Sequence, residues 1–170
     1  TLLWSLDTAT VCTSVRGAVV AHLEIRAAEH DIHGGLVSGS GLDPLAELCR
    51  VLGRLHDDQG RVAIPGFYDD VRPPTDAQRE ALAALPFDTD DWLGRTGCLA
   101  VSGEEGWSVP ERMWWRPAAE VTMLIGGEPE RPPRAVIPAV ARADIGLRLV
   151  PDQRAEQAVE QLRRWIADQV

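Results

Sequence analysis

The chain contains 170 residues, 45% of them hydrophobic, and carries a formal net charge of −9. This length and apolar content suffice for one domain with its own core, and they exclude a disordered tail. The excess of acidic residues repels a phosphate backbone, which disfavours a nucleic-acid partner. No apolar run approaches the roughly 20 residues of a membrane span, and the N-terminus lacks signal-peptide character, so we expect a cytoplasmic protein with no membrane partner.

The cysteines are few and widely spaced. Cys12, Cys49 and Cys98 show neither a CxxC pair nor a CxxxH spacing. This spacing argues against a zinc site and against a dense disulfide framework. We therefore expect buried, reduced thiols.

The first regular element that the sequence predicts is a strand from about Gly17 to Arg26. Apolar side chains alternate there with more polar ones, which is the period of a strand with one face on a core. A glycine-rich run, AAEHDIHGGLVSGSG, follows at residues 27–41 and predicts a bendable loop. Asp43 and Pro44 then give a helix N-terminus signal, and apolar residues at helical spacing predict a helix that ends near His56.

Residues 57–116 differ in composition from the regions on either side, because they contain repeated Gly and Pro turn signals. Thr75 and Gln78 are placed for a capping box, and short helices are expected at residues 75–85 and 88–93. Loops of this length normally carry function or structure of their own, so we predict an insertion of roughly 60 residues that packs beside the main sheet.

Regular strands resume at residues 117–127 and 135–150, and Asp152 is expected to cap a final helix with an apolar stripe. The order is therefore strand, helix, insertion, strand, strand, helix. It predicts an α+β fold, a two-layer ferredoxin-like sandwich in which an antiparallel sheet carries two helices on one face. The order is one strand short of the full βαββαβ pattern.

Arg148 is the first candidate for chemistry, because it lies on the polar face of the 135–150 strand. A guanidinium there could bind a carboxylate with two parallel hydrogen bonds. The alternative is a cross-strand ion pair, for instance with Glu120. From the pattern alone, the ion pair is the more economical interpretation.

His33 is the second candidate, because it lies in the glycine-rich loop where a ligand can approach the backbone closely. The spacing of Asp31 and His33 superficially suggests a metal pair, but the four histidines lack metal-ligand spacing with nearby carboxylates, so no metal site is predicted in this chain. A solvated loop histidine is the alternative. The residues by themselves assemble no complete catalytic set.

Four runs of the sequence, taken in order, resemble the lid or dimerization domain of the M20 family of zinc metallopeptidases. They are DIHGGLVSGSGLDPLAEL, LHDDQGRVAIPGFYDDV, WWRPAAEV and AVIPAVARADIGLRLVPDQ, and they cover nearly the whole chain. The likeness is greatest to the long-insert branch of carnosinase-like dipeptidases, with succinyl-diaminopimelate desuccinylase and acylases as relatives. The resemblance implies that residues 1–170 form a single lid domain, and that a separate catalytic domain, absent from this chain, holds two zinc ions and a carboxylate base.

The resemblance also implies roles for individual residues. His33 matches the histidine of a DxHSGxxGG loop, which reaches across a twofold homodimer and donates a hydrogen bond to the oxyanion in the partner's active site. Arg148 matches an arginine that binds the carboxylate of the substrate, a small peptide or N-acyl amino acid. Thr122 occupies a position often held by asparagine or histidine, and it is a further substrate-binding candidate.

The sequence departs from the family pattern at several positions, including Gly34 for serine, Ser38 for glycine and Ala135 for threonine. These changes leave the substrate undetermined, and they admit an inactive relative as one interpretation. The family's last strand is expected beyond Val170, and the fragment alone is expected to be inactive. The alternative function is a noncatalytic, ferredoxin-like dimeric module that binds a small carboxylate for regulation.

Overall fold

The computed structural model describes residues 11, 14–128, 130 and 132–170. Its elements, in chain order, are β1 (Gly17–Arg26), β2 (Ile32–His33), α1 (Gly34–Val37), α2 (Pro44–Leu52), α3 (Asp76–Ala83), α4 (Thr89–Thr96), α5 (Val109–Trp114), β3 (Ala118–Gly126), β4 (Val136–Ile137), β5 (Val140–Leu149) and α6 (Ala155–Ala167). Among the described residues, no helix combines the length and the apolarity needed to cross a bilayer. A cytoplasmic location stays a prediction.

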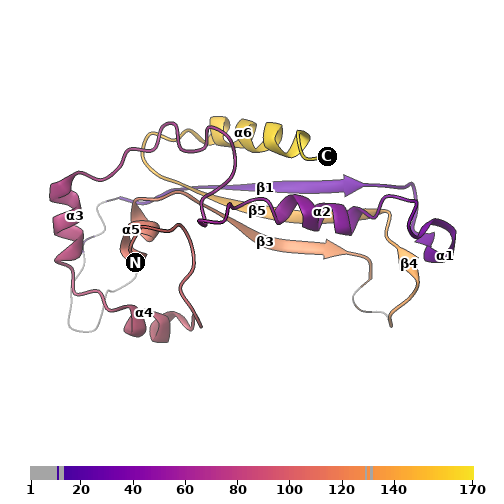
Figure 1. Cartoon of the computed structure of the whole chain (residues 1–170), viewed down its shortest axis with the longest axis horizontal. Coiled ribbons are helices and arrows are strands. Elements are labelled where there is room, and N and C mark those ends of the chain that lie inside the picture. The colour runs from indigo at the N-terminus through magenta and orange to yellow at the C-terminus, as the bar shows by residue number, and fades with distance from the viewer. Residues whose placement is uncertain (1–10, 12–13, 129, 131) are drawn as a thin grey trace.

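Three strands form the main sheet, with β5 in the middle and β1 and β3 at its edges (Figure 1). Both pairings are antiparallel. The β1–β5 register runs from Gly17 opposite Leu149 to Arg26 opposite Val140. A separate two-stranded ladder joins β2 to β4. The predicted α+β class with an antiparallel sheet is therefore confirmed.

The core lies between one face of this sheet and the helices α2 and α6. Ile145 and Leu147 of β5 are fully buried against Val51 of α2 and against Leu162 and Trp165 of α6. Full burial of such a side chain contributes about 1.5–3 kcal/mol. This layer therefore fixes which face of β5 is turned away from solvent.

Both α2 and α6 pack on the core face, and the opposite face of the sheet carries charged side chains, in agreement with the polar face expected from the sequence. Arg142 pairs with Glu24 across β5 and β1 at 2.8 Å, and the Nδ1 atom of His22 lies 2.6 Å from a carboxylate oxygen of Asp144. We call this surface the open face. It carries Arg148, which belongs to the same alternating set of β5 residues.

The helix predicted to end near His56 ends earlier, at Leu52. Asp43 caps its start as predicted, by accepting hydrogen bonds from the backbone of the first turn. Gly53 closes the helix, and Leu55 reaches the core from the turn that follows. Leu55 continued the apolar spacing of the helix in the sequence, although it lies beyond the helix end. A residue in the following turn can be buried as well as one in the helix, so the spacing predicted too long a helix.

The strand predicted over residues 135–150 is interrupted. Val136 and Ile137 form β4, and β5 starts only at Val140. Pro138 lies at the break and has no N–H to donate to a ladder, so the chain changes partner there. The first piece consequently pairs with β2 instead of joining the main sheet.

The expectation that Asp152 caps α6 is wrong. Asp152 has a positive φ of 75°, and its carboxylate pairs with Arg72 at 2.5 Å. Arg154 occupies the N-cap position and makes no side-chain capping bond. Asp152 instead turns the chain two residues earlier.

The expectation of buried cysteines is also wrong for both cysteines that the structure describes. Cys49 lies on the solvent side of α2, and Cys98 follows α4; both are exposed. Cys12 lies outside the described residues. Wide spacing excluded a disulfide framework, but it carried no information about which side of a helix faces the core.

We call residues 57–116 the 57–116 segment. It contains α3, α4 and α5, which lie at the end of the sheet where β3 begins (Figure 1). Thr75 and Gln78 form the predicted capping box at α3. Helix α5 was not predicted, although Ser108 and Glu111 form a second capping box at its start. The spacing of Ser108 and Glu111 is a local signal for the start of this helix.

A buried ion pair joins the 57–116 segment to the start of β3. Arg116 binds Glu104 through two bonds of 2.8 and 2.7 Å, and both residues are only 8% exposed. The Arg116 guanidinium lies between the rings of Tyr68 and Trp107, at 4.8 and 4.5 Å from their centroids. Stacking and bidentate pairing together satisfy the buried charge.

Candidate functional site

His33 lies at the junction of β2 and α1, with its side chain exposed. Its Nδ1 atom accepts a hydrogen bond of 3.0 Å from the backbone N–H of Gly35. An accepting Nδ1 carries no proton, so the proton of the neutral ring is on Nε2. The ring therefore presents a hydrogen-bond donor on the side away from its own backbone.

The segment around His33 is held by hydrogen bonds to the β4 region. His33 pairs with Val136, and Gly34 donates its N–H to the Ala135 carbonyl at 2.7 Å. The Asp31 carboxylate accepts the Ala139 N–H at 2.8 Å. The prediction of a bendable loop is therefore wrong for this stretch, because β4 supplies partners that sequence composition does not reveal.

Gly35 is required by the position of the imidazole ring. A Cβ atom at Gly35 would lie 3.0 Å from both Cε1 and Nδ1 of His33, which is closer than side-chain contacts normally allow. Any side chain at this position would push the ring away from the Gly35 N–H. The glycine therefore permits the hydrogen bond that orients His33.

Arg148 lies on the open face near the far end of β5, opposite Ala18 of β1 and Ala118 of β3. Within the part of the chain that the structure describes, Arg148 makes no hydrogen bond and no ion pair. The expected pair with Glu120 is not formed; Glu120 lies opposite Gly146, on the diagonal from Arg148. The guanidinium keeps its donors available to a ligand.

Arg16 was not among the residues predicted from the sequence. It lies two residues before Ala18, the residue of β1 that pairs with Arg148. Its Nη1 donates to the carbonyls of Arg112 and Arg116 at 3.4 and 3.3 Å. The alternation of β1, extended back by two residues from Ala18, was the signal for its placement on the same side as Arg148.

Thr122 lies in a β-bulge of β3, between Val121 and Met123. Its hydroxyl donates to the Asp144 carbonyl at 3.3 Å, and the side chain is exposed. A bulge re-aims a side chain relative to the regular alternation. Thr122 is therefore accessible, at the edge of the sheet.

His33 and Arg148 lie at opposite ends of the sheet and do not meet within one chain. The His33 segment follows the end of β1 that pairs with Val140, whereas Arg148 is eight residues further along β5. At about 3.3 Å per residue this corresponds to about 26 Å. Figure 1 shows α1 and β4 at one end of the sheet and α5 at the other.

The outer edge of β3 is open and apolar. Val121, Leu124 and Ile125 are exposed to 43%, 46% and 46%. An edge strand with unpaired backbone groups and large apolar side chains is suited to pairing with another strand. The β3 edge is therefore suited to association with another strand.

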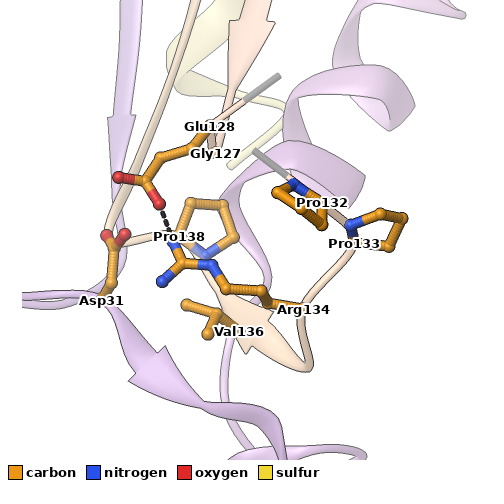
Figure 2. Close-up of a pocket in the computed structure, with 8 residues that line it drawn as sticks. All are labelled: Asp31, Gly127, Glu128, Pro132, Pro133, Arg134, Val136 and Pro138. Carbon is orange, nitrogen blue, oxygen red and sulfur yellow. Dashed lines mark ion pairs between the residues drawn. The ribbon is translucent and has the colours of Figure 1, made fainter. Parts of the chain in front are cut away.

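A shallow hollow of about 90 Å³ lies beside β4, lined by Asp31, Gly127, Glu128, Pro132, Pro133, Arg134, Val136 and Pro138 (Figure 2). It is well below the ~300 Å³ at which ligand pockets begin. Glu128 and Arg134 form an ion pair across it, as Figure 2 shows. The hollow braces the chain that leads into β4 and offers no room for a substrate.

No three His, Cys, Asp or Glu side chains of the described chain gather closely enough to hold a metal ion. The residues described here therefore do not fit a zinc centre. Any metal used by the complete protein would have to be held by other residues.

An antiparallel sheet with helices on one face and an exposed apolar edge strand is an architecture suited to association. Residues 13–170 match the model of the M20 peptidase dimerisation domain, and the chain belongs to that family.

Two curated relatives are dipeptidases. The chain is 25% identical over 153 residues to the human Beta-Ala-His dipeptidase, covering 90% of this chain and 30% of that protein. It is 26% identical over 150 residues to the Cys-Gly metallodipeptidase of Candida albicans, covering 88% of this chain and 31% of the relative. The chain thus spans about a third of the length of the curated relatives it matches.

Among solved structures, the fold is similar to an M20 family metallo-carboxypeptidase from Sulfolobus solfataricus. The TM-score is 0.81 at 26% identity, and the match covers 91% of this chain and 40% of the other. Most of this chain therefore superposes on one part of a larger metallopeptidase.

Proposed function

We propose that this chain is the dimerization and lid domain of an M20 metallopeptidase, a zinc-dependent amide hydrolase acting on dipeptides or N-acyl amino acids, with the 57–116 segment as an insertion. The observation that carries the proposal is the exposed His33 ring. Its Nδ1 is engaged by Gly35, so its Nε2–H is free to donate outward. Such a donor suits the oxyanion that forms when an amide carbonyl is attacked.

The chemistry explains why one histidine is enough. A hydrogen-bond donor aimed at the oxyanion of a tetrahedral intermediate contributes about a hundredfold to a thousandfold in rate. The ring must be oriented before the charge develops, because reorganisation during the reaction would cost part of that gain. The bond from Gly35 to Nδ1 supplies this orientation.

A homodimer through the β3 edge resolves the separation of His33 and Arg148. In a twofold dimer the two copies use the same patch, so two β3 strands would pair antiparallel. Antiparallel pairing turns the His33 end of one protomer toward the Arg148 end of its partner. One composite site would then contain His33 from one protomer, with Arg148 and the metal-holding domain of the other.

Arg148 and Thr122 are proposed to bind the substrate. Arg148 is exposed and has no bound partner among the described residues, so its fork of donors suits the substrate carboxylate. The exposed Thr122 hydroxyl lies in the edge strand and can contact a ligand near the dimer axis. Two zinc ions, expected to activate the attacking water when bound, would be held outside the described residues, which gather no metal-binding cluster.

A noncatalytic dimeric module that binds a small carboxylate is the second candidate, supported by the same unengaged Arg148. The two candidates differ in what His33 does. A binding module has no need of an outward Nε2 donor at the opposite end of the sheet. The role of His33 in turnover therefore separates them.

Subunit complementation in the full-length enzyme tests the proposal. His33→Ala and a variant that lacks a metal ligand of the catalytic domain should each be nearly inactive as homodimers. When they are mixed and allowed to exchange subunits, half the dimers are mixed and each restores one of two sites, so about a quarter of wild-type activity should return. His30→Ala, an exposed histidine of the same segment, is the matched control and should stay active. Exchange without recovery would show that His33 does not serve its partner's site.

A further inference from the structure

Arg148 is flanked diagonally by two charged residues of the neighbouring strands. Arg148 pairs directly with Ala18, so Arg16 is its diagonal neighbour on the β1 side. It pairs with Ala118 on the other side, so Glu120 is its diagonal neighbour on β3. Diagonal positions lie about 7–8 Å apart, which is within reach of long side chains.

The residues immediately around Arg148 on the open face have small side chains. The residues directly opposite are alanines, and the next open-face position along β5 is Gly146. No bulky side chain on these adjacent rungs separates Arg148 from Arg16 or from Glu120.

Arg16 retains donors of its own. A guanidinium has five N–H donors, and toward the described residues Arg16 uses only Nη1, which donates to the carbonyls of Arg112 and Arg116. Its Nε and Nη2 donors have no partner among the described residues. The two carbonyls hold one amino group of the guanidinium beside the end of α5.

The electrostatics of Arg16 agree with this placement. Burial lowers the pKa of the Arg16 guanidinium, the carboxylate of Glu120 acts in the opposite direction, and the positive charge of Arg148 adds to the lowering. Arg16 therefore interacts electrostatically with Glu120 and Arg148, although it forms no hydrogen bond with either of them. An anion seated between the two guanidiniums would relieve their mutual repulsion.

We propose that Arg16 and Arg148 together form the carboxylate-binding site of this domain, with Glu120 limiting it to a single negative charge. The proposal rests on the function proposed above and names its substrate class. Two guanidiniums and one carboxylate leave a net charge of +1, which matches one free α-carboxylate. Substrates with a free C-terminal carboxylate and an uncharged last side chain should be preferred over C-terminal amides and over peptides that end in Asp or Glu.

Steady-state kinetics on the full-length enzyme test this site. The substrates are one dipeptide with a free C-terminal carboxylate and the same dipeptide as its C-terminal amide. Arg16→Gln should raise KM for the carboxylate substrate about tenfold to a hundredfold, the range expected for a lost hydrogen bond to a charged group. The kcat value and the constants for the amide should change less than about twofold. Arg16→Lys keeps the charge and should recover part of the loss.

Arg142→Gln is the matched control, because Arg142 lies on the same strand and the same face but pairs with Glu24. It should change neither substrate's constants. Glu120→Gln should improve kcat/KM selectively for dipeptides that end in Asp or Glu, and this readout does not depend on how Arg16 variants fold.

The outcomes separate the inference from the proposed function. If Arg148→Gln discriminates between the two substrates while Arg16→Gln behaves like Arg142→Gln, the role of Arg16 is overturned and the proposed function stands. If Arg16→Gln weakens the carboxylate and the amide equally, Arg16 is structural and the inference is also overturned. If neither arginine discriminates, the carboxylate-binding role of Arg148 in the proposed function falls as well.

Discussion

The two ends of the sheet present their polar side chains in opposite ways. At one end, the ring of His33 is oriented by a hydrogen bond from the backbone N–H of Gly35, in a segment whose β2 strand pairs with β4. At the other end, Arg148 stands on the central strand with no bound partner among the described residues. The backbone beneath Arg148 is fixed by two neighbouring strands, so the strand positions it without a side-chain clamp.

The roles proposed above for His33 and Arg148 account for this difference. A donor to a developing oxyanion must point in one direction before the charge appears, so the protein clamps the ring. A guanidinium that receives a carboxylate is completed by the ligand, so its donors remain unengaged until binding. Substitutions that remove the supporting contacts at either end of the sheet test this difference.

The largest effect is expected at the Arg148 end, from Glu104→Gln. This change leaves the stacked Arg116 guanidinium buried without its counter-charge, and it should lower the free energy of unfolding by about 3–5 kcal/mol. Urea denaturation monitored by tryptophan fluorescence measures it. Glu160→Gln, which removes an exposed pair with Arg164 on α6, is the control and should have little effect. A loss as small as the control's would mean that the buried pair does not support this end of the molecule.

An intermediate effect is expected at the His33 end, from Gly35→Ala. The added methyl group would lie 3.0 Å from the ring, so the imidazole must move away from the Gly35 N–H. A displacement of about 1 Å costs about a hundredfold in rate. The ring has to give here by only a few tenths of an ångström, so kcat of the full-length enzyme should fall about twofold to tenfold with stability largely retained.

Gly94→Ala is the control for that substitution, because a Cβ at Gly94 in α4 meets no atom within 4 Å. It should leave kcat unchanged. Wild-type turnover in Gly35→Ala would show that the orientation of the ring by Gly35 is irrelevant to catalysis.

The smallest effect is expected from Asp31→Ala, which removes the bond from the Ala139 N–H to the carboxylate. The cost should be about 1 kcal/mol, the usual net value of such a bond. Hydrogen exchange should accelerate at Ala139 and Gly34 while the amides of β5 stay protected. Asp58→Ala, an exposed carboxylate elsewhere, serves for comparison; equal exchange in both variants would mean that Asp31 does not hold this segment.

Much of the fold could be predicted because its signals are local. Asp43 before Pro44 marked the start of α2, and Thr75 with Gln78 marked α3. The alternation along β5 correctly divided its residues between the core and the open face. Each signal depends on the sterics and hydrogen bonding of a few consecutive residues.

The errors arose where a distant segment decided the outcome. Pro138 split a run that reads as one strand, and β4 then found β2 as its partner. Asp152 resembled a cap but turned the chain and paired with Arg72. The glycine-rich stretch around His33 was expected to bend freely, yet the Ala135 and Ala139 backbones hold it in place.

By itself, the sequence determined the α+β class, the starts of α2 and α3 and the two faces of β5, because periodicity and capping act over a few residues. It also carried the family resemblance and the choice of His33, Arg148 and Thr122, whose roles stay proposals. Only the tertiary structure decided that His33 and Arg148 lie at opposite ends of the sheet and that Arg16 stands beside Arg148. Those relations depend on the register between strands far apart in the chain, which is set when the shared core is buried and not by any local pattern.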